Sequence, residues 1–267
     1  MKEKIFTVTN QVQVNCAIWD NVKKPIGVIQ IIHGIYDDIK AYNRFARFMN
    51  KSGYIVFGTD CQHCSPKRTC PNTFDVAVKL QTEIMHYLVN KYNLPIFIFG
   101  YGYGGFITQF ILQHSDIPTA GVCLAGTGKY PRFLLYMAKS YAWICAKIFG
   151  ANAPANVLNR ISVGKHRARG RVKCTYGFYL SLFSGIENIK PENQFNSPIL
   201  IISGANDNMN INARFSRALY NAYRDSGIMR LTLIIYPDAS DNLLLQMSFG
   251  EISQDILDFF KYHNTAE

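Results

Sequence analysis

The glycines at residues 100–104 have the spacing found in the strand-to-helix turns that carry the nucleophile of acyl-transfer enzymes. The apolar run Pro95–Phe99 leads into Gly100-Tyr101-Gly102-Tyr103-Gly104, and a helical pattern follows. In a Gly-x-Ser-x-Gly turn from strand to helix, the central serine attacks a carbonyl carbon, and small residues two positions away let strand and helix approach each other. Gly100 and Gly104 provide that clearance, but Gly102 has no hydroxyl. We therefore predict a preserved, strained turn without a nucleophile.

The same glycines also fit a phosphate-binding pattern. Gly100, Gly102 and Gly105 form Gly-x-Gly-x-x-Gly, which holds a pyrophosphate when it follows the first strand of a dinucleotide fold and an acidic residue stands about 20 positions later. The next apolar run, 120–125, ends in Gly-Thr-Gly without an acid, and several strands precede the motif. The sequence therefore favours the acyl-transfer turn, and no cofactor is predicted.

Strand and helix patterns that could position this turn alternate along the chain. Two runs of alternating polarity, 5–8 and 12–19, predict an antiparallel hairpin at the start. Buried-type strands are expected at 27–32, 54–58, 96–99, 121–125, 198–203 and 231–236, and helices at 41–51, 74–91, 106–114, 213–224 and 248–262. Such alternation favours one α/β domain whose parallel sheet is covered on both faces, and 267 residues suffice for it.

The net charge of +10 is concentrated in one segment. Of the 28 Lys and Arg residues, 11 lie between residues 129 and 190 with one of the 18 acids, so 17 bases and 17 acids remain elsewhere. Such a segment attracts anionic lipids or metabolites, although a solvated basic loop is an equally open interpretation. Nucleic acid is not expected, because the basic run 164–173 lacks aromatic side chains interleaved for base stacking. The densest run contains Lys165, Arg167, Arg169, Arg171 and Lys173.

Motifs along nearly the whole chain share a family pattern. They include Ile31-Ile32-His33-Gly34-Ile35, the segment 53–60, Ile98-Phe99-Gly100 with Gly104, and the segment 198–207. With these motifs the chain resembles the α/β-hydrolases, and among them the monoacylglycerol lipase and lysophospholipase-like (serine aminopeptidase S33-type) branch. The resemblance implies an eight-stranded, mostly parallel sheet with helices on both faces. It also implies that residues 1–128 and 191–267 form the core and residues 129–190 a basic helical cap.

The resemblance also assigns catalytic positions, of which only one is filled by the expected residue. The nucleophile position falls on Gly102, the acid on Asp207 and the histidine on Asp241, in the order that this fold uses. The backbone amides of Ile35 and Tyr103 would stabilise an oxyanion. A triad removed altogether leaves only about 10³ to 10⁴-fold catalysis over water in a well-measured case. The resemblance therefore implies a catalytically degenerate hydrolase.

Other residues could supply replacement chemistry. Asp207 and Asp241 should form a carboxylate pair that shares a proton, binds a cation or recognises a basic ligand, unless the pair is a relic with Asp241 in solvent. Cys61, Cys123 and Tyr103 are alternative nucleophiles, but none has an evident base beside it, and Cys123 lies in a buried-type strand.

A cysteine-rich loop follows residue 60. Cys61, His63, Cys64 and Cys70 offer zinc ligands, but structural zinc sites usually use two separated ligand pairs. Thiols at the rim of a pocket are therefore favoured, and no metal site is predicted.

The cysteine usage and the first residues suggest a compartment. Seven cysteines, an odd number, and first residues without the apolar core of a signal peptide are typical of a reduced cytoplasmic protein. Such a protein could also lie at a membrane surface. Three hypotheses follow: a protein that binds an acyl or amphiphilic small molecule without hydrolysing it, a residual carboxylic-ester hydrolase, and a module that contacts an anionic membrane surface or a protein through the basic cap.

Overall fold

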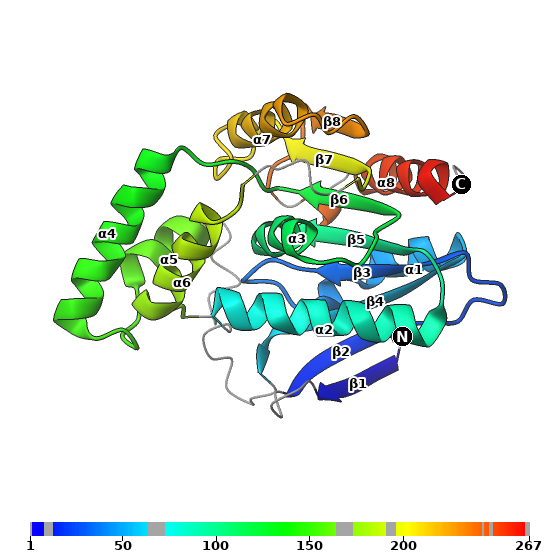
Figure 1. Cartoon of the computed structure of the whole chain (residues 1–267), viewed down its shortest axis with the longest axis horizontal. Helices are drawn as coiled ribbons and strands as arrows, with labels where there is room; N and C mark the ends of the chain where they lie inside the picture. The colour runs from blue at the N-terminus through cyan, green and yellow to red at the C-terminus, as the bar shows by residue number, and fades with distance from the viewer. Residues whose placement is uncertain are drawn as a thin grey trace.

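An eight-stranded sheet forms the centre of the molecule, in the order β1-β2-β4-β3-β5-β6-β7-β8 (Figure 1). The computed structural model describes residues 2–7, 13–63, 73–163, 173–190, 196–241, 243–245 and 248–264. β1 and β2 pair antiparallel, as do β2 and β4, and the other neighbours are parallel. The predicted hairpin and mostly parallel sheet are thus confirmed. The strands are β1 (Lys2–Thr7), β2 (Gln13–Trp19), β3 (Gly27–Ile32), β4 (Tyr54–His63), β5 (Ile96–Tyr101), β6 (Gly121–Ala125), β7 (Ile199–Gly204) and β8 (Leu231–Tyr236).

Helices cover both faces of the sheet, as the alternation of elements predicts. In β5, Ile96 and Ile98 join the core under α2, α3 and α7, whereas Phe97 and Phe99 join the core under α1 and α8. Side chains alternate between the faces of a strand, so a continuous apolar run is what a strand buried on both faces requires. The helices are α1 (Asn43–Lys51), α2 (Phe74–Tyr92), α3 (Tyr103–His114), α7 (Arg214–Asp225) and α8 (Phe249–Asn264), with short 3-10 turns at Ile39–Tyr42 and Leu243–Leu245.

Between β6 and β7 the chain leaves the sheet and forms α4 (Arg132–Phe149), α5 (Asn156–Val163) and α6 (Tyr176–Glu187). We call α4, α5 and α6 the inserted helices. Figure 1 shows them beside the sheet, beyond the carboxyl ends of the parallel strands. α4 packs on α6, and α6 packs on α2. The division of the chain at residues 128 and 190 stays a prediction.

Several elements begin or end away from their predicted positions, and β4 differs most. β4 continues to His63, beyond the predicted end at residue 58, because it pairs with β2 after its pairing with β3 stops at Gly58. Residues 59–63 are mostly polar, because this part of β4 pairs only with β2. The sequence therefore does not show the apolar pattern of a buried strand there. α3 begins at Tyr103 rather than at residue 106, and the low helix propensity of Gly104 and Gly105 explains why the sequence pattern does not indicate this first turn. In the described chain, no helix has both the length and the apolar character needed to cross a membrane.

Candidate functional site

The carboxyl ends of the parallel strands meet at one edge of the sheet and carry the predicted site residues. Ile35 follows β3, Gly102 follows β5, Asp207 follows β7 and Asp241 follows β8. All four line one cavity of about 390 Å³. In open α/β sheets, ligands bind outside these strand ends. The fold therefore brings together positions that are up to about 200 residues apart in the sequence.

The turn between β5 and α3 has the strained backbone that the sequence predicts. Gly102 lies between Tyr101, the last residue of β5, and Tyr103, the first residue of α3, with φ 54° and ψ −112°. Its amide donates a hydrogen bond to the carbonyl oxygen of Ala125 at 2.9 Å. Residues with a side chain adopt a positive φ only at a cost in energy, whereas glycine does so readily.

Packing fixes the flanking glycines but not Gly102. A Cβ atom at Gly104 would lie 1.9 Å from the carbonyl oxygen of Ile32, and one at Gly100 would lie 2.4 Å from a hydroxyl oxygen of α3. Among the described residues, a Cβ atom at Gly102 would meet only the Cα atom of Gly34, at 4.0 Å. Gly100 and Gly104 thus have the close packing that the predicted clearance role requires, and the space beside Gly102 would admit a side chain.

Asp207 is almost fully buried at the end of β7, with 2% of its surface exposed. Its Oδ1 atom accepts hydrogen bonds from the amides of Met209 at 2.9 Å and Asn210 at 3.0 Å. Burial raises the pKa of its carboxyl group from 3.8 to about 6, the two amide donors oppose this rise, and the carboxylate of Asp241 adds to it. Asp207 therefore changes charge about two pH units higher than an exposed aspartate.

Asp241 occupies the loop after β8, half-buried at the same cavity. Its backbone carbonyl accepts a hydrogen bond from the hydroxyl of Tyr101, which joins this loop to the end of β5. The structure thus places the two carboxylates close enough for Asp241 to raise the pKa of Asp207. This proximity is what the interpretation as a carboxylate pair requires.

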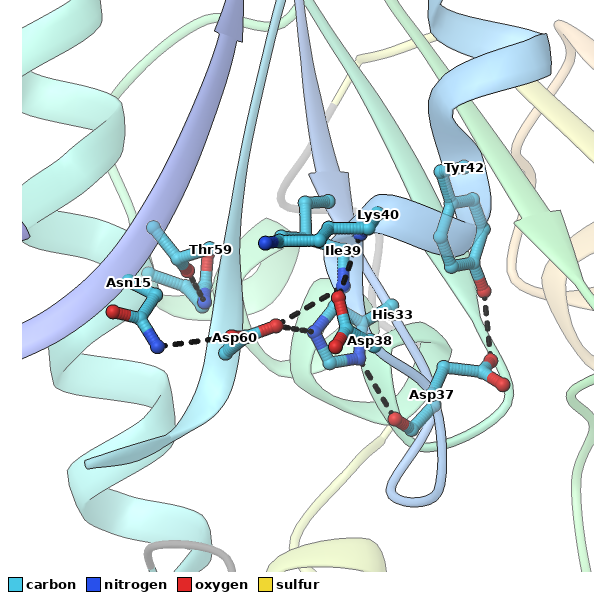
Figure 2. A network of polar contacts seen from close by, with 11 residues as sticks. Asn15, His33, Asp37, Asp38, Ile39, Lys40, Tyr42, Thr59 and Asp60 are labelled. Atoms are coloured by element: carbon cyan, nitrogen blue, oxygen red, sulfur yellow. Dashed lines mark hydrogen bonds and ion pairs between the residues drawn. The ribbon is translucent and has the colours of Figure 1, made fainter. Parts of the chain in front are cut away.

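A polar network anchors the loop after β3 (Figure 2). The Oδ1 atom of Asp60 accepts a hydrogen bond from the amide of Ile39 at 3.0 Å and lies 3.6 Å from Nε2 of His33. The other ring nitrogen of His33 lies 2.8 Å from the carbonyl oxygen of Gly34. Burial acts to raise the pKa of Asp60, but His33, Ile39 and Asn15 together hold it below its usual value. These contacts join β2, β3 and β4 and fix where the loop enters the cavity.

Two backbone amides assigned by resemblance also belong to the cavity wall. Ile35 follows the anchored loop, and Tyr103 is the first residue of α3. Leading amides of a helix point away from it and are suited to hold negative charge. The role of Ile35 and Tyr103 as oxyanion donors stays a prediction.

The inserted helices close the cavity opposite the sheet edge with mostly apolar side chains. Leu134 and Leu135 come from α4, Ile161 from α5, and Leu182 and Phe183 from α6. Ligand sites are typically concave, mostly apolar and supplied with a few polar groups. The cavity matches this description, with its polar groups at the strand ends.

A cluster of hydroxyl groups joins the anchored loop to the inserted helices, and the sequence did not predict it. The hydroxyls of Tyr36 and Ser162 lie 2.5 Å apart, and those of Ser162 and Tyr179 lie 2.6 Å apart. The hydroxyl of Tyr179 also donates to the Oδ1 atom of Asn159 at 3.1 Å. These residues are far apart in the sequence and share no motif, so only the packed structure reveals them.

The predicted anion-binding run lies mostly outside the described residues. Lys165, Arg167, Arg169 and Arg171 belong to 164–172, and only Lys173 is described, as an exposed residue. Their role in binding an anionic partner stays a prediction.

The cysteine predictions divide in the same way. Cys64 and Cys70 lie outside the described residues, and so do the side chains of Cys61 and His63. Cys123 lies fully buried in β6, and burial raises the pKa of its thiol well above the usual range. A buried thiol with a raised pKa is inert, as the sequence interpretation held.

Comparison with known proteins gives a family match. The family model described as serine aminopeptidase, S33, matches residues 23–244, which is most of the chain. No curated protein sequence matches the chain.

Solved structures resemble the fold over nearly the full length. A thermostable carboxyl esterase from Bacillus coagulans, in complex with glycerol, has a TM-score of 0.84 at 15% identity, with 99% of each chain covered. A monoglyceride lipase from Saccharomyces cerevisiae, in complex with a substrate analog, has a TM-score of 0.74 at 15% identity, covering 98% of this chain and 96% of that one. A monoacylglycerol lipase from Paleococcus ferrophilus has a TM-score of 0.68 at 16% identity, covering 94% and 99%. At these identities the likeness shows the fold alone.

Proposed function

Because the chain belongs to the serine aminopeptidase S33 family of α/β-hydrolases, we propose that it binds an amphiphilic or acyl small molecule without hydrolysing it. The observation that carries this proposal is Gly102, which occupies a nucleophile turn with the required backbone but without a side chain. The turn opens onto an apolar cavity of about 390 Å³. The scaffold thus retains a ligand site while the attacking group is missing.

The proton acceptor is missing as well. In a serine hydrolase the acid orients a histidine, which takes the proton from the serine. Here Asp241 stands at the histidine position, and two neighbouring carboxylates cannot form an acid–histidine hydrogen bond. Without a nucleophile and without a base, a covalent acyl intermediate has no route of formation.

Activity assays with a matched variant test this proposal. We expect the natural chain to leave a panel of monoacylglycerol and lysophospholipid esters unhydrolysed and to remain unlabelled by a fluorophosphonate probe. The double variant Gly102→Ser, Asp241→His restores both missing groups and serves as the comparator for detectable turnover. Covalent labelling of any residue in the cavity of the natural chain would contradict the proposal.

A residual ester hydrolase is the alternative that the fold leaves open. Ile35 and Tyr103 line the cavity, and their backbone amides would remain whatever side chains are lost. Oxyanion donors alone retain part of a hydrolase's rate. The variants Cys61→Ser and Cys123→Ser distinguish the two cases. Ester turnover well above the solvent background that survives both substitutions would favour the hydrolase.

A second candidate function rests on the outer surface of the inserted helices. On α4, Phe133, Trp143 and Phe149 are 62%, 55% and 64% exposed, and Val157 of α5 is 51% exposed. Exposed apolar side chains mark an interaction site on a protein where they form one contiguous patch. Around it, the described residues of 129–190 include seven basic residues and one acid. Aromatic and aliphatic side chains beside basic ones suit an anionic phospholipid surface.

Vesicle binding tests this candidate. We expect the chain to sediment with vesicles that contain phosphatidylserine and to bind phosphatidylcholine vesicles more weakly. The variant Trp143→Ser, Phe149→Ser should weaken binding, whereas Met229→Ser, at an exposed apolar residue before β8, is the matched control. Equal sedimentation of both variants would exclude α4 as the contact.

A further inference from the structure

The charge inside the cavity is opposite in sign to the charge of the whole chain. Among the described residues that line it, the acidic side chains are Asp37, Asp207 and Asp241, and there is no lysine, arginine or histidine. The chain as a whole carries a formal charge of +10. The basic residues of the described inserted helices thus face elsewhere, and a ligand inside the cavity meets carboxylates.

Asp207 has one oxygen atom whose hydrogen-bonding capacity is unused by the described residues. Its Oδ1 atom accepts two backbone amides, whereas no described residue donates to Oδ2. Only 2% of the residue is exposed, and it still lines the cavity. A buried carboxylate without a full set of donors is costly, so a donor or a positive charge supplied by a ligand would stabilise it.

The space for such a group lies beside Gly102. Gly34 and Gly102 leave the region in front of the turn without a side chain, because both are glycines. Asp207 and Asp241 border this region from the ends of β7 and β8. A small polar head could therefore occupy the volume where a serine side chain and an imidazole are absent.

The rest of the cavity suits an alkyl chain rather than a metal ion. Beyond the strand ends its walls are Leu134, Leu158, Ile161, Leu182 and Ile186, all from the inserted helices or their edges. A calcium ion would need six to eight oxygen ligands, and among the described residues no group of three or more His, Cys, Asp or Glu side chains is placed to hold a metal ion. A cavity with one polar end and one apolar end is suited to bind an amphiphile.

We propose that the cavity selects an amphiphile with a cationic head, such as a primary alkylamine, whose ammonium group lies between Asp207 and Asp241 and whose chain extends beneath the inserted helices. This inference rests on the proposed binding function and narrows it. An ammonium group donates to Oδ2 of Asp207 and offsets the repulsion between the two carboxylates. A fatty-acid carboxylate at the same place would meet two negative charges, so anionic amphiphiles are excluded from this orientation.

Calorimetric titration of the full chain with decylamine, 1-decanol and decanoate tests the head group at constant chain length. At neutral pH we expect decylamine to bind at least about tenfold more tightly than 1-decanol, the factor that one charge-assisted hydrogen bond provides, and decanoate to bind most weakly. Equal affinities for all three would overturn the cationic preference and leave amphiphile binding intact. Absence of binding by all three would overturn the proposed function itself.

Charge-neutralising variants identify the residues involved. Asp207→Asn keeps an oxygen for the amides of Met209 and Asn210, and Asp241→Asn changes a half-buried loop residue, so at least one variant should fold normally by thermal unfolding. Each variant should lower the affinity for decylamine about tenfold and leave the affinity for 1-decanol unchanged. Asp238→Asn removes the same charge from an exposed position outside the cavity and is the matched control. If Asp238→Asn lowered the affinity for decylamine as much as the other two variants, the effect would come from net charge. That result would contradict a binding site at Asp207 and Asp241.

Discussion

Gly104 and Gly102 are two residues apart but belong to two different regions of the molecule. Gly104 belongs to the packed framework behind the sheet edge, where an added Cβ would overlap the backbone of β3. Gly102 belongs to the cavity wall in front of that edge, where a side chain would have room. The framework is determined by close packing and leaves little choice of residue. The cavity wall is free to change, and its residues determine what the protein binds.

Substitution of Gly104 should have the largest effect, because it tests the framework. In Gly104→Ala the new methyl group would lie 1.9 Å from a backbone oxygen, which neither β3 nor α3 can avoid without separating. We expect a loss of more than about 4 kcal/mol in the free energy of unfolding, or no folded protein. Urea denaturation measures this loss. A fully stable Gly104→Ala protein would contradict the packing described for the turn.

Asp207 should lower the free energy of unfolding at neutral pH, whereas Gly104 is needed for stability. The reason is that Asp207 is a buried carboxylate in the cavity wall. The pKa of Asp207 is about 6 in the folded chain against 3.8 ordinarily, so between these values the folded state binds more protons than the unfolded state. Stability should therefore fall as pH rises from about 4 to about 6 and remain lower above that range. A shift of this size corresponds to a contribution on the order of 2–3 kcal/mol.

The variant Asp207→Asn isolates this contribution. It should be more stable than the natural chain at neutral pH, and the difference should disappear near pH 4, where both side chains are neutral. Thermal unfolding at a series of pH values measures both curves. An identical pH dependence in the two proteins would show that Asp207 is not the group responsible.

A side chain at Gly102 should be tolerated. Gly102→Ser must hold a positive φ of 54°, which costs about 1 kcal/mol, but its Cβ meets no close atom among the described residues. Urea denaturation should thus give a much smaller loss than for Gly104→Ala. A loss as large as that of Gly104→Ala would remove the distinction between framework and cavity wall.

The hydroxyl cluster should have the smallest effect, because it joins the anchored loop to the inserted helices by a few hydrogen bonds at the cavity. Tyr36→Phe removes one partner of Ser162 and should lower the free energy of unfolding by about 1 kcal/mol. Faster amide hydrogen exchange in α5 is the expected accompanying change, and Tyr136→Phe, on the exposed side of α4, is the control. Unchanged exchange in α5 would show that the cluster does not hold the inserted helices in place.

Much of the framework could be predicted because local sequence patterns specify its strands, turns and helices. The apolar run of β5 and the glycines at 100 and 104 specify a buried strand, a tight turn and a helix, and the structure has all three. The hydroxyls of Tyr36, Ser162 and Tyr179 could not be predicted in this way. Each is an ordinary surface-compatible residue in the sequence, and their contact depends on how α5 and α6 pack on the loop after β3.

The sequence by itself determined the order of the elements, the family resemblance and the identity of Gly102 and Asp241, because local periodicity and motif residues need no knowledge of distant contacts. Only the tertiary structure decided that Asp207 is buried with an oxygen atom to which no described residue donates, and that the charged side chains among the described cavity residues are acidic in a basic protein. Burial and the sign of a local field depend on which distant side chains are brought together. Those quantities exist only once the chain has folded.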